Sequence, residues 1–270
     1  MRVLTWNLYH GRDSPPDPAL FTTRGRLLRA TERNATHVQV NRLLLDEFAE
    51  LIDGLEWDVA LLQEAPPRWF RELARRTRSS GVRVLTSRNW CPPLQGALAE
   101  WNPDLIASWE GGSNQILVRH PGRVVEHRRL TLARLPERRR MQWARVELPR
   151  DGRVCMANLH ASAGLPLRAS AEVIRAARAA VEWSGPNPLV FGGDLNLRPA
   201  REPGPFAVLR ECFGLGEPTA ADAIDHLLVR GMRVVEPPRR LDPERRELRE
   251  PDGLRLRLSD HALVAAAFVR

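Results

Sequence analysis

The chain has no lysine, only one tyrosine and no long hydrophobic run. No segment approaches the roughly 20 consecutive apolar residues that a helix needs to cross a bilayer, so we expect no stable insertion into a membrane. The N-terminus begins with a strand pattern and lacks the features of a signal peptide. These absences favour a cytoplasmic protein.

Cysteine is also scarce. Cys91, Cys155 and Cys212 are odd in number and far apart in the sequence. They form no Cys-x-x-Cys pair, which disfavours a zinc or redox site built on cysteine. Reduced, buried thiols account for all three, and such thiols fit a reducing compartment.

Positive charge, in contrast, is abundant. All 41 basic residues are arginine, against 33 acidic residues, and the formal net charge is +8 at pH 7. A GC-rich coding sequence explains the replacement of lysine by arginine without any functional cause. The surplus of positive charge is a separate observation, because basic surfaces attract polyanions such as nucleic acid or anionic headgroups. The planar guanidinium also suits phosphate. The charge therefore favours a phosphate-bearing partner without identifying it.

Short apolar runs alternate with amphipathic segments along the chain. The segments Asn41–Leu55, Pro67–Arg78 and Leu167–Trp183 have helical periodicity or helix-start signals, and the apolar runs predict buried strands. This alternation predicts an α/β or α+β architecture. We find no repeat and no long linker, and we expect a single domain over residues 1–270. The predicted strands are Arg2–Trp6, Asp58–Leu62, Gln115–Val118, Val154–Ala157, Leu189–Phe191, Ile224–Val229 and Ala262–Val269.

Three further segments lack a clear period. We expect Gly11–Val40 and Thr86–Gly112, which contains Trp90, to be irregular excursions, and Pro237–Leu254 to be an extended surface loop. Arginines in the first and last of these segments could follow a phosphate backbone. They are Arg24, Arg26, Arg29, Arg239, Arg240, Arg245 and Arg246.

The ends of the predicted strands carry carboxylate, amide and imidazole side chains. At such sheet edges, loops converge on a site that a rigid sheet holds in place. Each residue alone has an ordinary explanation, such as an asparagine in a turn or a hydrogen-bonded core histidine. Together they supply the groups that phosphoester chemistry with a hard cation requires. The candidates are Asn7, Glu64, His160, Asp194, Asn196, Asp225, Asp260 and His261.

The order and rough spacing of these residues resemble the endonuclease/exonuclease/phosphatase superfamily. It includes DNase I, exonuclease III-type AP endonucleases, inositol-polyphosphate 5-phosphatases and neutral sphingomyelinases. The resemblance spans residues 1–270 and implies a four-layer sandwich, in which two mixed β-sheets pack face to face with helices outside each. The motifs that carry it are Thr5-Trp-Asn7, Gln63-Glu64, Asn158-Leu-His160, Gly193-Asp-Leu-Asn196, Ile224-Asp225 and Ser259-Asp-His261.

The resemblance implies a Mg²⁺ cofactor, with Mn²⁺ as an alternative. Glu64 is expected to ligate the metal, because a hard cation prefers a few carboxylates and keeps several waters. Asp260 and Asn7 are expected to complete that site, directly or through water. In the superfamily, the residue matching Asp194 positions or deprotonates the attacking water. The residue matching Asn196 hydrogen-bonds the phosphate or the nucleophile.

Two histidines and two arginines complete the implied site. His261, as an imidazolium, is expected to stabilise the charge of the transition state, with Asp225 holding its tautomer. His160 resembles the second histidine of the DNase I-like branch, which assists the leaving group. Arg140 or Arg139 is expected to clamp a phosphate oxygen, although a solvated basic run explains these two arginines equally well.

The substrate is less well defined. Exonuclease III-type AP endonucleases usually carry a tyrosine in the strand of Asn158-Leu-His160, whereas the only tyrosine here is Tyr9. Inositol 5-phosphatases usually carry Trp-Cys-Asp-Arg near the position of Asp225, and this chain has Ala223-Ile-Asp-His-Leu. Neutral sphingomyelinases often carry apolar membrane-binding elements, and none is evident here. These three subclasses are therefore disfavoured.

The remaining function is that of a divalent-metal-dependent phosphodiester hydrolase. In such an enzyme an activated water makes an in-line attack on the phosphate. The positive charge favours DNA or RNA as the substrate. A phosphatase or phosphodiesterase acting on a small-molecule or lipid phosphoester remains an alternative. A non-catalytic phosphate-binding protein is a third possibility, but retention of Glu64, Asp194 and His261 argues against it. The sequence does not indicate an oligomeric state.

Overall fold

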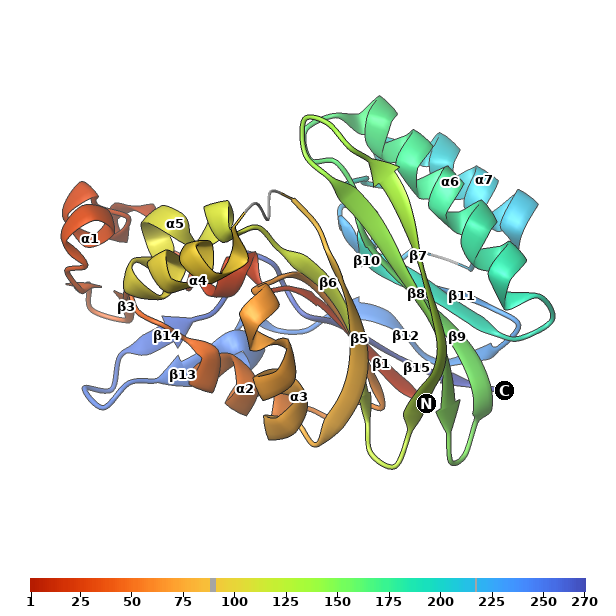
Figure 1. Ribbon diagram of the computed structural model, residues 1–270, viewed down its shortest axis with the longest axis horizontal. Helices are drawn as coiled ribbons and strands as arrows, with labels where there is room; N and C mark the ends of the chain where they lie inside the picture. Colours follow the sequence, from red (N-terminus) through yellow and green to blue (C-terminus); the bar gives the residue numbers. More distant parts are fainter. Residues whose placement is uncertain (88–90, 217) are drawn as a thin grey trace.

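Two mixed β-sheets pack face to face at the centre of the molecule (Figure 1). The computed structural model describes residues 1–87, 91–216 and 218–270. One sheet contains β1 (Arg2–Asn7), β4 (Val59–Ala65), β5 (Ser79–Leu85), β6 (Ser113–Arg119), β12 (Arg233–Arg240) and β15 (Val264–Val269), in the order β12-β15-β1-β4-β6-β5. The other contains β7 (Arg123–Ala133), β8 (Arg139–Leu148), β9 (Gly152–His160), β10 (Leu189–Asp194) and β11 (Asp225–Arg230), in the order β11-β10-β9-β8-β7.

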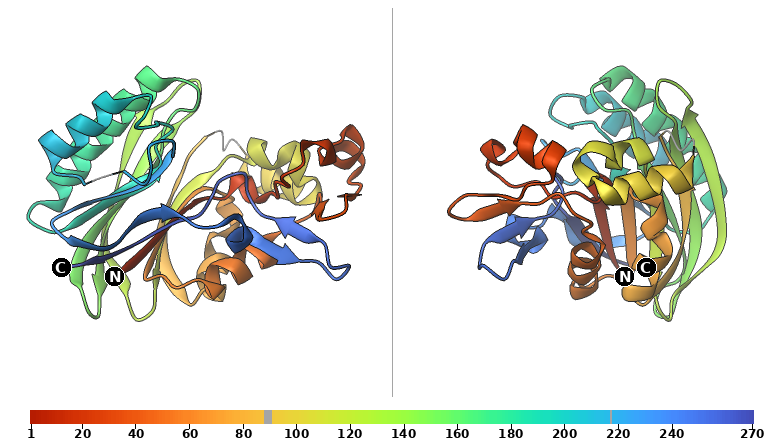
Figure 2. Two further views of the ribbon diagram at one scale, coloured as in Figure 1. Left: turned by 180° about the vertical axis from the view of Figure 1, so that it is seen from behind. Right: turned by 60° about the vertical axis from the view of Figure 1, so that its left-hand side comes forward.

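Each sheet contains one pair of parallel neighbours. β1 pairs with β4 and β9 pairs with β10 in parallel, and the other neighbours in these two sheets are antiparallel. Because parallel strands end at the same edge, the ends of β1 and β4 meet in one sheet and those of β9 and β10 in the other. The chain termini lie together near the starts of these strands, where the Met1 amino group donates to the carbonyl of Phe268 at 2.8 Å (Figure 2).

A hydrophobic core fills the space between the two sheets. Val59 and Ile116 of one sheet pack in the same cluster as Met156 and Val190 of the other, and all four are completely buried. These strands are covered on both faces, which explains why they read as continuous apolar runs rather than as alternating ones.

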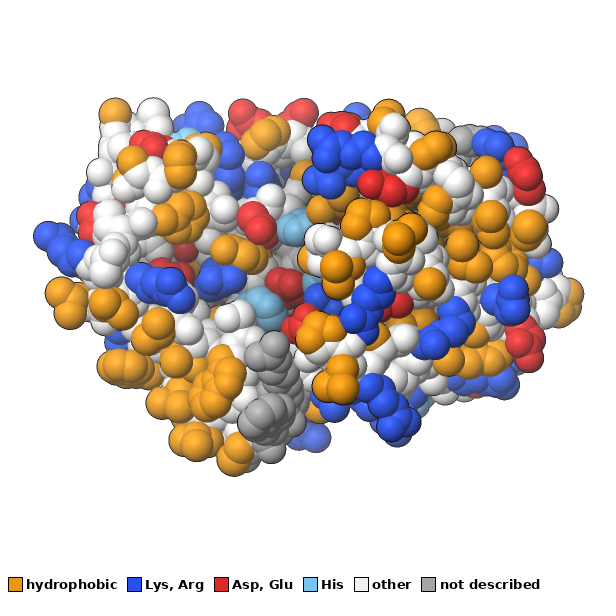
Figure 3. Space-filling model, turned by 90° about the horizontal axis from the view of Figure 1, so that it is seen from above, with side chains coloured by type: hydrophobic (Ala, Val, Ile, Leu, Met, Phe, Trp, Pro, Cys, Tyr) orange, Lys and Arg blue, Asp and Glu red, His pale blue; other side chains and the backbone are white. Residues whose placement is uncertain are grey.

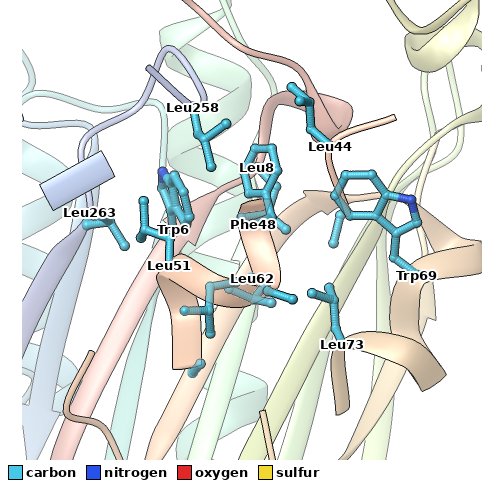
Figure 4. Packing of buried hydrophobic residues seen from close by; sticks show 14 of the residues in the cluster. Trp6, Leu8, Leu44, Phe48, Leu51, Leu62, Trp69, Leu73, Leu258 and Leu263 are labelled. Carbon is cyan, nitrogen blue, oxygen red and sulfur yellow. The ribbon is translucent and has the colours of Figure 1, made fainter. Parts of the chain in front are cut away.

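Two pairs of helices cover the outer faces of the sheets. They are α2 (Leu45–Gly54) and α3 (Phe70–Arg76) on the six-stranded sheet, and α6 (Pro166–Ser184) and α7 (Pro203–Phe213) on the five-stranded sheet. Phe48 of α2 and Leu73 of α3 pack in one cluster with Trp6 and Leu62 of the sheet (Figure 4). The succession helix, sheet, sheet, helix confirms the predicted four-layer sandwich. None of the described helices is long and apolar enough to cross a membrane.

The segment Thr86–Gly112 is not irregular, and the prediction was wrong there. It forms α4 (Pro92–Trp101) and α5 (Pro103–Glu110), each with a proline at its first helical position. Proline at that position favours a helix because the missing amide would have had no intrahelical partner. The Asn102 side chain also caps α5 by accepting a hydrogen bond from the Leu105 amide at 3.1 Å. Trp90, which was predicted to lie in this excursion, falls outside the described residues.

The segments Gly11–Val40 and Pro237–Leu254 are also more regular than expected. They contribute to a four-stranded sheet of order β13-β14-β3-β2, in which strands distant in sequence pair with one another. Strands of two or three residues are too short to show a period, so no sequence pattern predicted them. The additional elements are β2 (Glu32–Arg33), β3 (His37–Gln39), β13 (Glu247–Arg249), β14 (Arg255–Arg257), α1 (Thr23–Leu28), and the 3₁₀ turns η1 (Tyr9–Gly11), η2 (Pro18–Leu20), η3 (Pro67–Trp69) and η4 (Pro243–Arg246).

Candidate active site

Six of the predicted residues come together where the two sheets end. Histidine and acidic side chains gather in a hollow at the centre of this face, with arginine side chains on both sides (Figure 3). The residues come from the ends of β1, β4, β9 and β10, from the start of β11, and from the turn before β15. We call Asn7, Glu64, His160, Asp194, Asp225 and His261 the polar cluster.

Strand register places three members of the polar cluster in one row. Asp194 of β10 is paired with His160 of β9 on one side and with Asp225 of β11 on the other. Gly193, which precedes Asp194, has a φ of 119°, and a Cβ at this position would lie 2.1 Å from the carbonyl oxygen of Leu159. Only glycine fits there, so the Gly-Gly-Asp sequence is required for the strand to reach the site.

Asp194 is the centre of the polar cluster and is almost completely buried. Its Oδ2 accepts a hydrogen bond from Asn7 Nδ2 at 3.1 Å and lies 3.3 Å from His160 Nε2. Its Oδ1 accepts from the backbone amide of Asn196 at 3.1 Å. Burial and the neighbouring Asp225 carboxylate raise the pKa of Asp194 to about 7, against the opposing effect of His261. This carboxyl group can therefore exchange a proton near neutral pH.

His261 is held as a cation between carboxylates. Its Nδ1 lies 2.8 Å from Asp225 Oδ2, and its Nε2 lies 3.9 Å from Asp194 Oδ2. Burial alone would lower the pKa of His261, but the Asp225, Asp194 and Asp260 carboxylates outweigh it and raise the pKa to about 10. Trp6 fixes the backbone here, because its Nε1 donates to the His261 carbonyl at 3.0 Å.

Glu64 enters the site through an irregularity in its strand. The pairing of β4 with β6 shifts register between Leu62 and Ala65, and Glu64 has a φ of 47°. Such a bulge turns a side chain away from the direction that the regular strand would give it. Glu64 Oε2 lies 3.3 Å from His10 Nε2, and Oε1 lies 3.6 Å from His160 Nδ1. Burial raises the pKa of Glu64 to about 7.

A polar contact between the sheets supports this end of the sandwich. Gln63 Nε2 donates to Asn158 Oδ1 at 2.7 Å, and Asn158 Nδ2 donates to the backbone carbonyls of Leu62 and Gln115. Buried amides of this kind fix the relative position of the strands that they connect. Gln63 and Asn158 precede Glu64 and His160 by one and two residues, so the contact aligns those two side chains.

The two predicted arginines lie in different surroundings. Arg139 is buried, and its Nη1 contacts His160 Nδ1 at 2.9 Å while Nη2 pairs with Glu137 at 2.6 Å. Arg140 donates from Nη1 to the carbonyl of Leu85 at 3.3 Å, beside β5. Arg139 therefore joins the polar cluster through His160, whereas Arg140 lies on its margin.

The remaining predicted residues surround the polar cluster. Asn196 Nδ2 donates to the carbonyl of Ala161 at 3.0 Å, and Asp260 is exposed with Oδ1 3.9 Å from His261 Nε2. The neighbouring His226 is completely buried and packs against Phe206, with its Nε2 3.1 Å from the Leu197 carbonyl.

The sequence did not predict His10. This residue follows Asn7 by three positions and lies in η1, with a φ of 55°. Burial and the charge of Arg12 lower the pKa of His10 to about 3, so the imidazole beside Glu64 is neutral. The prediction relied on polar residues at the ends of strands. It could not find a residue that a left-handed turn brings back into the site.

Two groups of donor atoms could be considered for a metal ion. Ligand atoms of Asp194, Asp225 and His261 lie within 4.8 Å of one another. However, an imidazolium has no lone pair to offer, so this group is better described as a cation held by two carboxylates. Among the described residues, the closest side-chain partners of Glu64 are the neutral imidazoles of His10 and His160, and the cationic groups that act on it do so without direct contact. Of the two groups, the oxygen donors around Glu64 are therefore the better fit to a divalent cation.

Known proteins share this sequence pattern and this fold. A model of the endonuclease/exonuclease/phosphatase family matches residues 4–261. The structure is similar to a mannosyl-6-phosphatase of Bacteroides thetaiotaomicron, with 14% identity, 100% of both chains covered and a TM-score of 0.67. It is also similar to the human Nocturnin catalytic domain, with 17% identity, 99% of this chain and 93% of that chain covered, and a TM-score of 0.64. No curated protein matches the sequence, and at these identities the structural similarity concerns the fold alone.

Proposed function

Since the chain belongs to the endonuclease/exonuclease/phosphatase family, we propose that it is a divalent-metal-dependent phosphodiester hydrolase acting on DNA or RNA. One observation carries the proposal. A buried carboxyl group with a pKa of about 7, Asp194, lies beside an imidazolium with a pKa of about 10, His261. The first suits a proton acceptor at neutral pH, and the second suits stabilisation of a phosphate oxyanion.

Glu64, Asp260 and Asn7 would hold the metal ion. All three offer oxygen donors, and half-buried Glu64 has no cationic side chain in direct contact among the described residues. Mg²⁺ prefers such ligands, and Mn²⁺ accepts them as well. A bound ion supplies charge neutralisation to the phosphate that is hydrolysed.

Asp194 receives a proton from the attacking water. The Asn7 amide holds Oδ2 and the Asn196 backbone amide holds Oδ1, so the carboxylate has a fixed orientation. The Asn196 side-chain nitrogen is occupied by the Ala161 carbonyl, which leaves its amide oxygen to orient the water or the substrate. Positioning of this kind removes much of the entropic cost of an in-line attack.

His261 stabilises negative charge on the phosphate, and Asp225 keeps the His261 imidazole protonated and oriented. His160 is a neutral imidazole, because its Nδ1 faces the Arg139 guanidinium and burial lowers its pKa. It therefore carries its proton on Nε2, as a hydrogen-bond donor toward the reacting groups. We assign it to assisting the leaving oxygen.

The net charge of +8 and the arginines on both sides of the hollow support a polyanionic substrate (Figure 3). A nucleic-acid strand would present phosphates both to the polar cluster and to these arginines. A small-molecule or lipid phosphoester would use the polar cluster alone.

The test is a matched set of hydrolysis assays in Mg²⁺, Mn²⁺ and EDTA. The substrates are a DNA duplex, a single-stranded RNA, bis(p-nitrophenyl) phosphate and sphingomyelin. Cleavage of nucleic acid that EDTA and Asp194→Asn both abolish would support the proposal. Turnover of only the reporter or the lipid would replace nucleic acid with the alternative substrates. No turnover of any of them would favour a phosphate-binding protein.

A further inference from the structure

A polar cavity of about 280 Å³ lies beside the polar cluster and is not used by the mechanism above. Its walls come from η1, from the residues before and within α1, from β3 and from α5. Tyr9, Arg12, Arg26, Gln39, Asp104 and Ser108 are among its lining residues.

Tyr9 connects the cavity to the polar cluster. Its backbone amide donates to Asn7 Oδ1 at 3.0 Å, and its ring lies 3.7 Å from the guanidinium carbon of Arg12. Burial raises the pKa of the Tyr9 phenol, and the charge of Arg12 opposes this shift. Tyr9 therefore contacts both Asn7 of the polar cluster and Arg12 of the cavity.

Two arginines of the cavity have no direct ion-pair partner in the described part of the chain, although the Asp104 carboxylate acts on both from a distance. Neither Arg12 nor Arg26 forms an ion pair with any residue that the structure describes. Arg12 is held by a hydrogen bond from Nε to the Tyr9 carbonyl at 3.3 Å, which leaves its terminal nitrogens free to bind a ligand. The backbone of Arg26 is fixed as well, because its carbonyl accepts from Asn41 and Asn102 at 3.1 and 3.0 Å.

Two carboxyl groups line the same cavity, but together they do not balance the positive charge of the two arginines. Asp13 Oδ2 accepts from the Val40 amide at 3.0 Å, and burial raises the pKa of Asp13 to about 8, so it is largely neutral at pH 7. Asp104 Oδ2 accepts from Gln39 Nε2 at 2.7 Å. The cavity thus faces its ligand with two guanidinium groups against one carboxylate. The planar guanidinium group of arginine suits phosphate, because it can donate two hydrogen bonds to phosphate oxygens at once.

We propose that this cavity binds a second phosphate of the substrate, next to the phosphate that is hydrolysed, with Arg12 and Arg26 as its ligands. The inference rests on the proposed phosphoester chemistry of the polar cluster. A neighbouring nucleotide in a strand and the second phosphate of a small bisphosphate share this chemistry. The exposed hydroxyl of Ser108 on α5 supplies a further donor at the wall of the cavity.

Binding measurements test the cavity independently of turnover. Thymidine 3′,5′-bisphosphate and thymidine 5′-monophosphate are titrated into the full-length protein by calorimetry in EDTA. We expect the bisphosphate to bind about tenfold more tightly, and Arg26→Gln to remove most of that advantage. Arg33→Gln is the matched control, because Arg33 is exposed on nearby β2, pairs with Asp252 at 3.2 Å and does not line the cavity. Equal losses in both variants would overturn the proposal, as would no loss in Arg26→Gln.

Turnover assays separate the two sources of the phosphate and the two proposals. The dinucleotides TpT and pTpT differ only in a terminal phosphate, and glucose 6-phosphate and glucose 1,6-bisphosphate provide the small-molecule pair. A preference for pTpT that Arg26→Gln reduces would assign the neighbouring nucleotide, and a preference only for the sugar bisphosphate would assign the small compound. Hydrolysis with no preference in either pair would overturn the cavity proposal alone. Bisphosphate binding that depends on Arg26, without hydrolysis of any substrate, would overturn the proposed function alone.

Discussion

Arg139 Nη1 lies 2.9 Å from His160 Nδ1, and a guanidinium can only donate a hydrogen bond. Nδ1 must therefore be the unprotonated nitrogen of the ring, and the single proton lies on Nε2, which faces Asp194 at 3.3 Å. Burial and the charge of Arg139 both lower the pKa of His160 well below its usual range. The arginine thus fixes the tautomer that the proposed mechanism requires.

The first prediction concerns Arg139→Gln. Without the guanidinium charge, the pKa of His160 should rise, and its ring should lose its single tautomer. Long-range ¹⁵N NMR of the histidine ring reports both effects directly. We also expect kcat/KM to fall about tenfold or more, by analogy with other displaced acid–base groups. Arg129→Gln, an exposed change on β7, is the control. A His160 spectrum and titration that match the wild type would contradict the assignment.

The second prediction concerns the pH dependence that Asp225 imposes. Asp225 and its neighbours raise the pKa of His261 to about 10, so the active imidazolium persists across the physiological range. In Asp225→Asn the pKa of His261 should fall, and activity should be lost as the pH rises through that lower value. At pH 9 we expect a loss of about 10²-fold or more in kcat/KM, and a smaller loss at pH 6. A pH–rate profile that is lowered equally at all pH values would contradict this role.

The sequence predicted the members of the polar cluster because each lies at the end or the start of a recognisable strand. Asp194, for example, ends an apolar run, and strand register then brings it beside His160 and Asp225. The register itself was not predictable, because it depends on which strands pair. The same limit applies to Arg139, whose contact with His160 requires β8 to lie beside β9.

Other features were not predictable because they depend on unusual local backbone conformations or on pairing between strands that are distant in sequence. His10 reaches Glu64 through a left-handed turn, and Glu64 itself has a positive φ at a bulge. The four-stranded sheet joins β3 to β14, which are separated by more than two hundred residues of sequence. In α4 and α5 the prolines suggested breaks, but they lie where helices begin.

The third prediction concerns metal binding by His10. Its Nε2 lies 3.3 Å from Glu64 Oε2, so a neutral imidazole adjoins the carboxylate that is proposed to hold the metal. Removal of such a neighbouring group typically weakens metal binding by about 10- to 100-fold. Titration of Mn²⁺ into His10→Ala, followed by electron paramagnetic resonance of the free ion, measures this loss without any substrate.

His127→Ala is the matched control for His10, because His127 is exposed on β7. Glu64→Gln provides the reference for loss of a proposed ligand. We expect Glu64→Gln to weaken Mn²⁺ binding most, His10→Ala to be intermediate, and His127→Ala to match the wild type. Wild-type affinity in His10→Ala would exclude His10 from the metal site.

The fourth prediction concerns stability and pH at Asp13. Burial raises the pKa of Asp13 to about 8, whereas an unfolded aspartate titrates near 4. Between these values the folded state binds more protons than the unfolded state, so this group makes the protein less stable as pH rises, by up to about 1.4 kcal/mol per pH unit. Asp13→Asn keeps an acceptor for the Val40 amide and removes the titration.

Urea unfolding from pH 5 to pH 9 measures this effect. The stability of Asp13→Asn relative to the wild type should increase with pH up to about 8 and then remain constant. The exposed Asp242→Asn change serves as the control for loss of one acidic side chain. A difference between Asp13→Asn and the wild type that does not vary with pH would show that Asp13 is charged in the folded protein.

The fifth prediction separates stability from site geometry by means of two buried tryptophans. Trp6 Nε1 donates to the His261 carbonyl at 3.0 Å, and Trp143 Nε1 donates to Ser184 Oγ at 3.2 Å in the core under α6. Replacement of either by phenylalanine removes one buried hydrogen bond and some packing, and each should cost about 1–3 kcal/mol of stability.

Only Trp6→Phe releases the turn that carries His261. We therefore expect Trp6→Phe to lower kcat about tenfold or more at a temperature where both variants are folded, and Trp143→Phe to keep the wild-type value. Equal activity in the two variants would mean that Ser259, which donates from Oγ to the Asn7 carbonyl at 2.6 Å, holds this turn without help from Trp6.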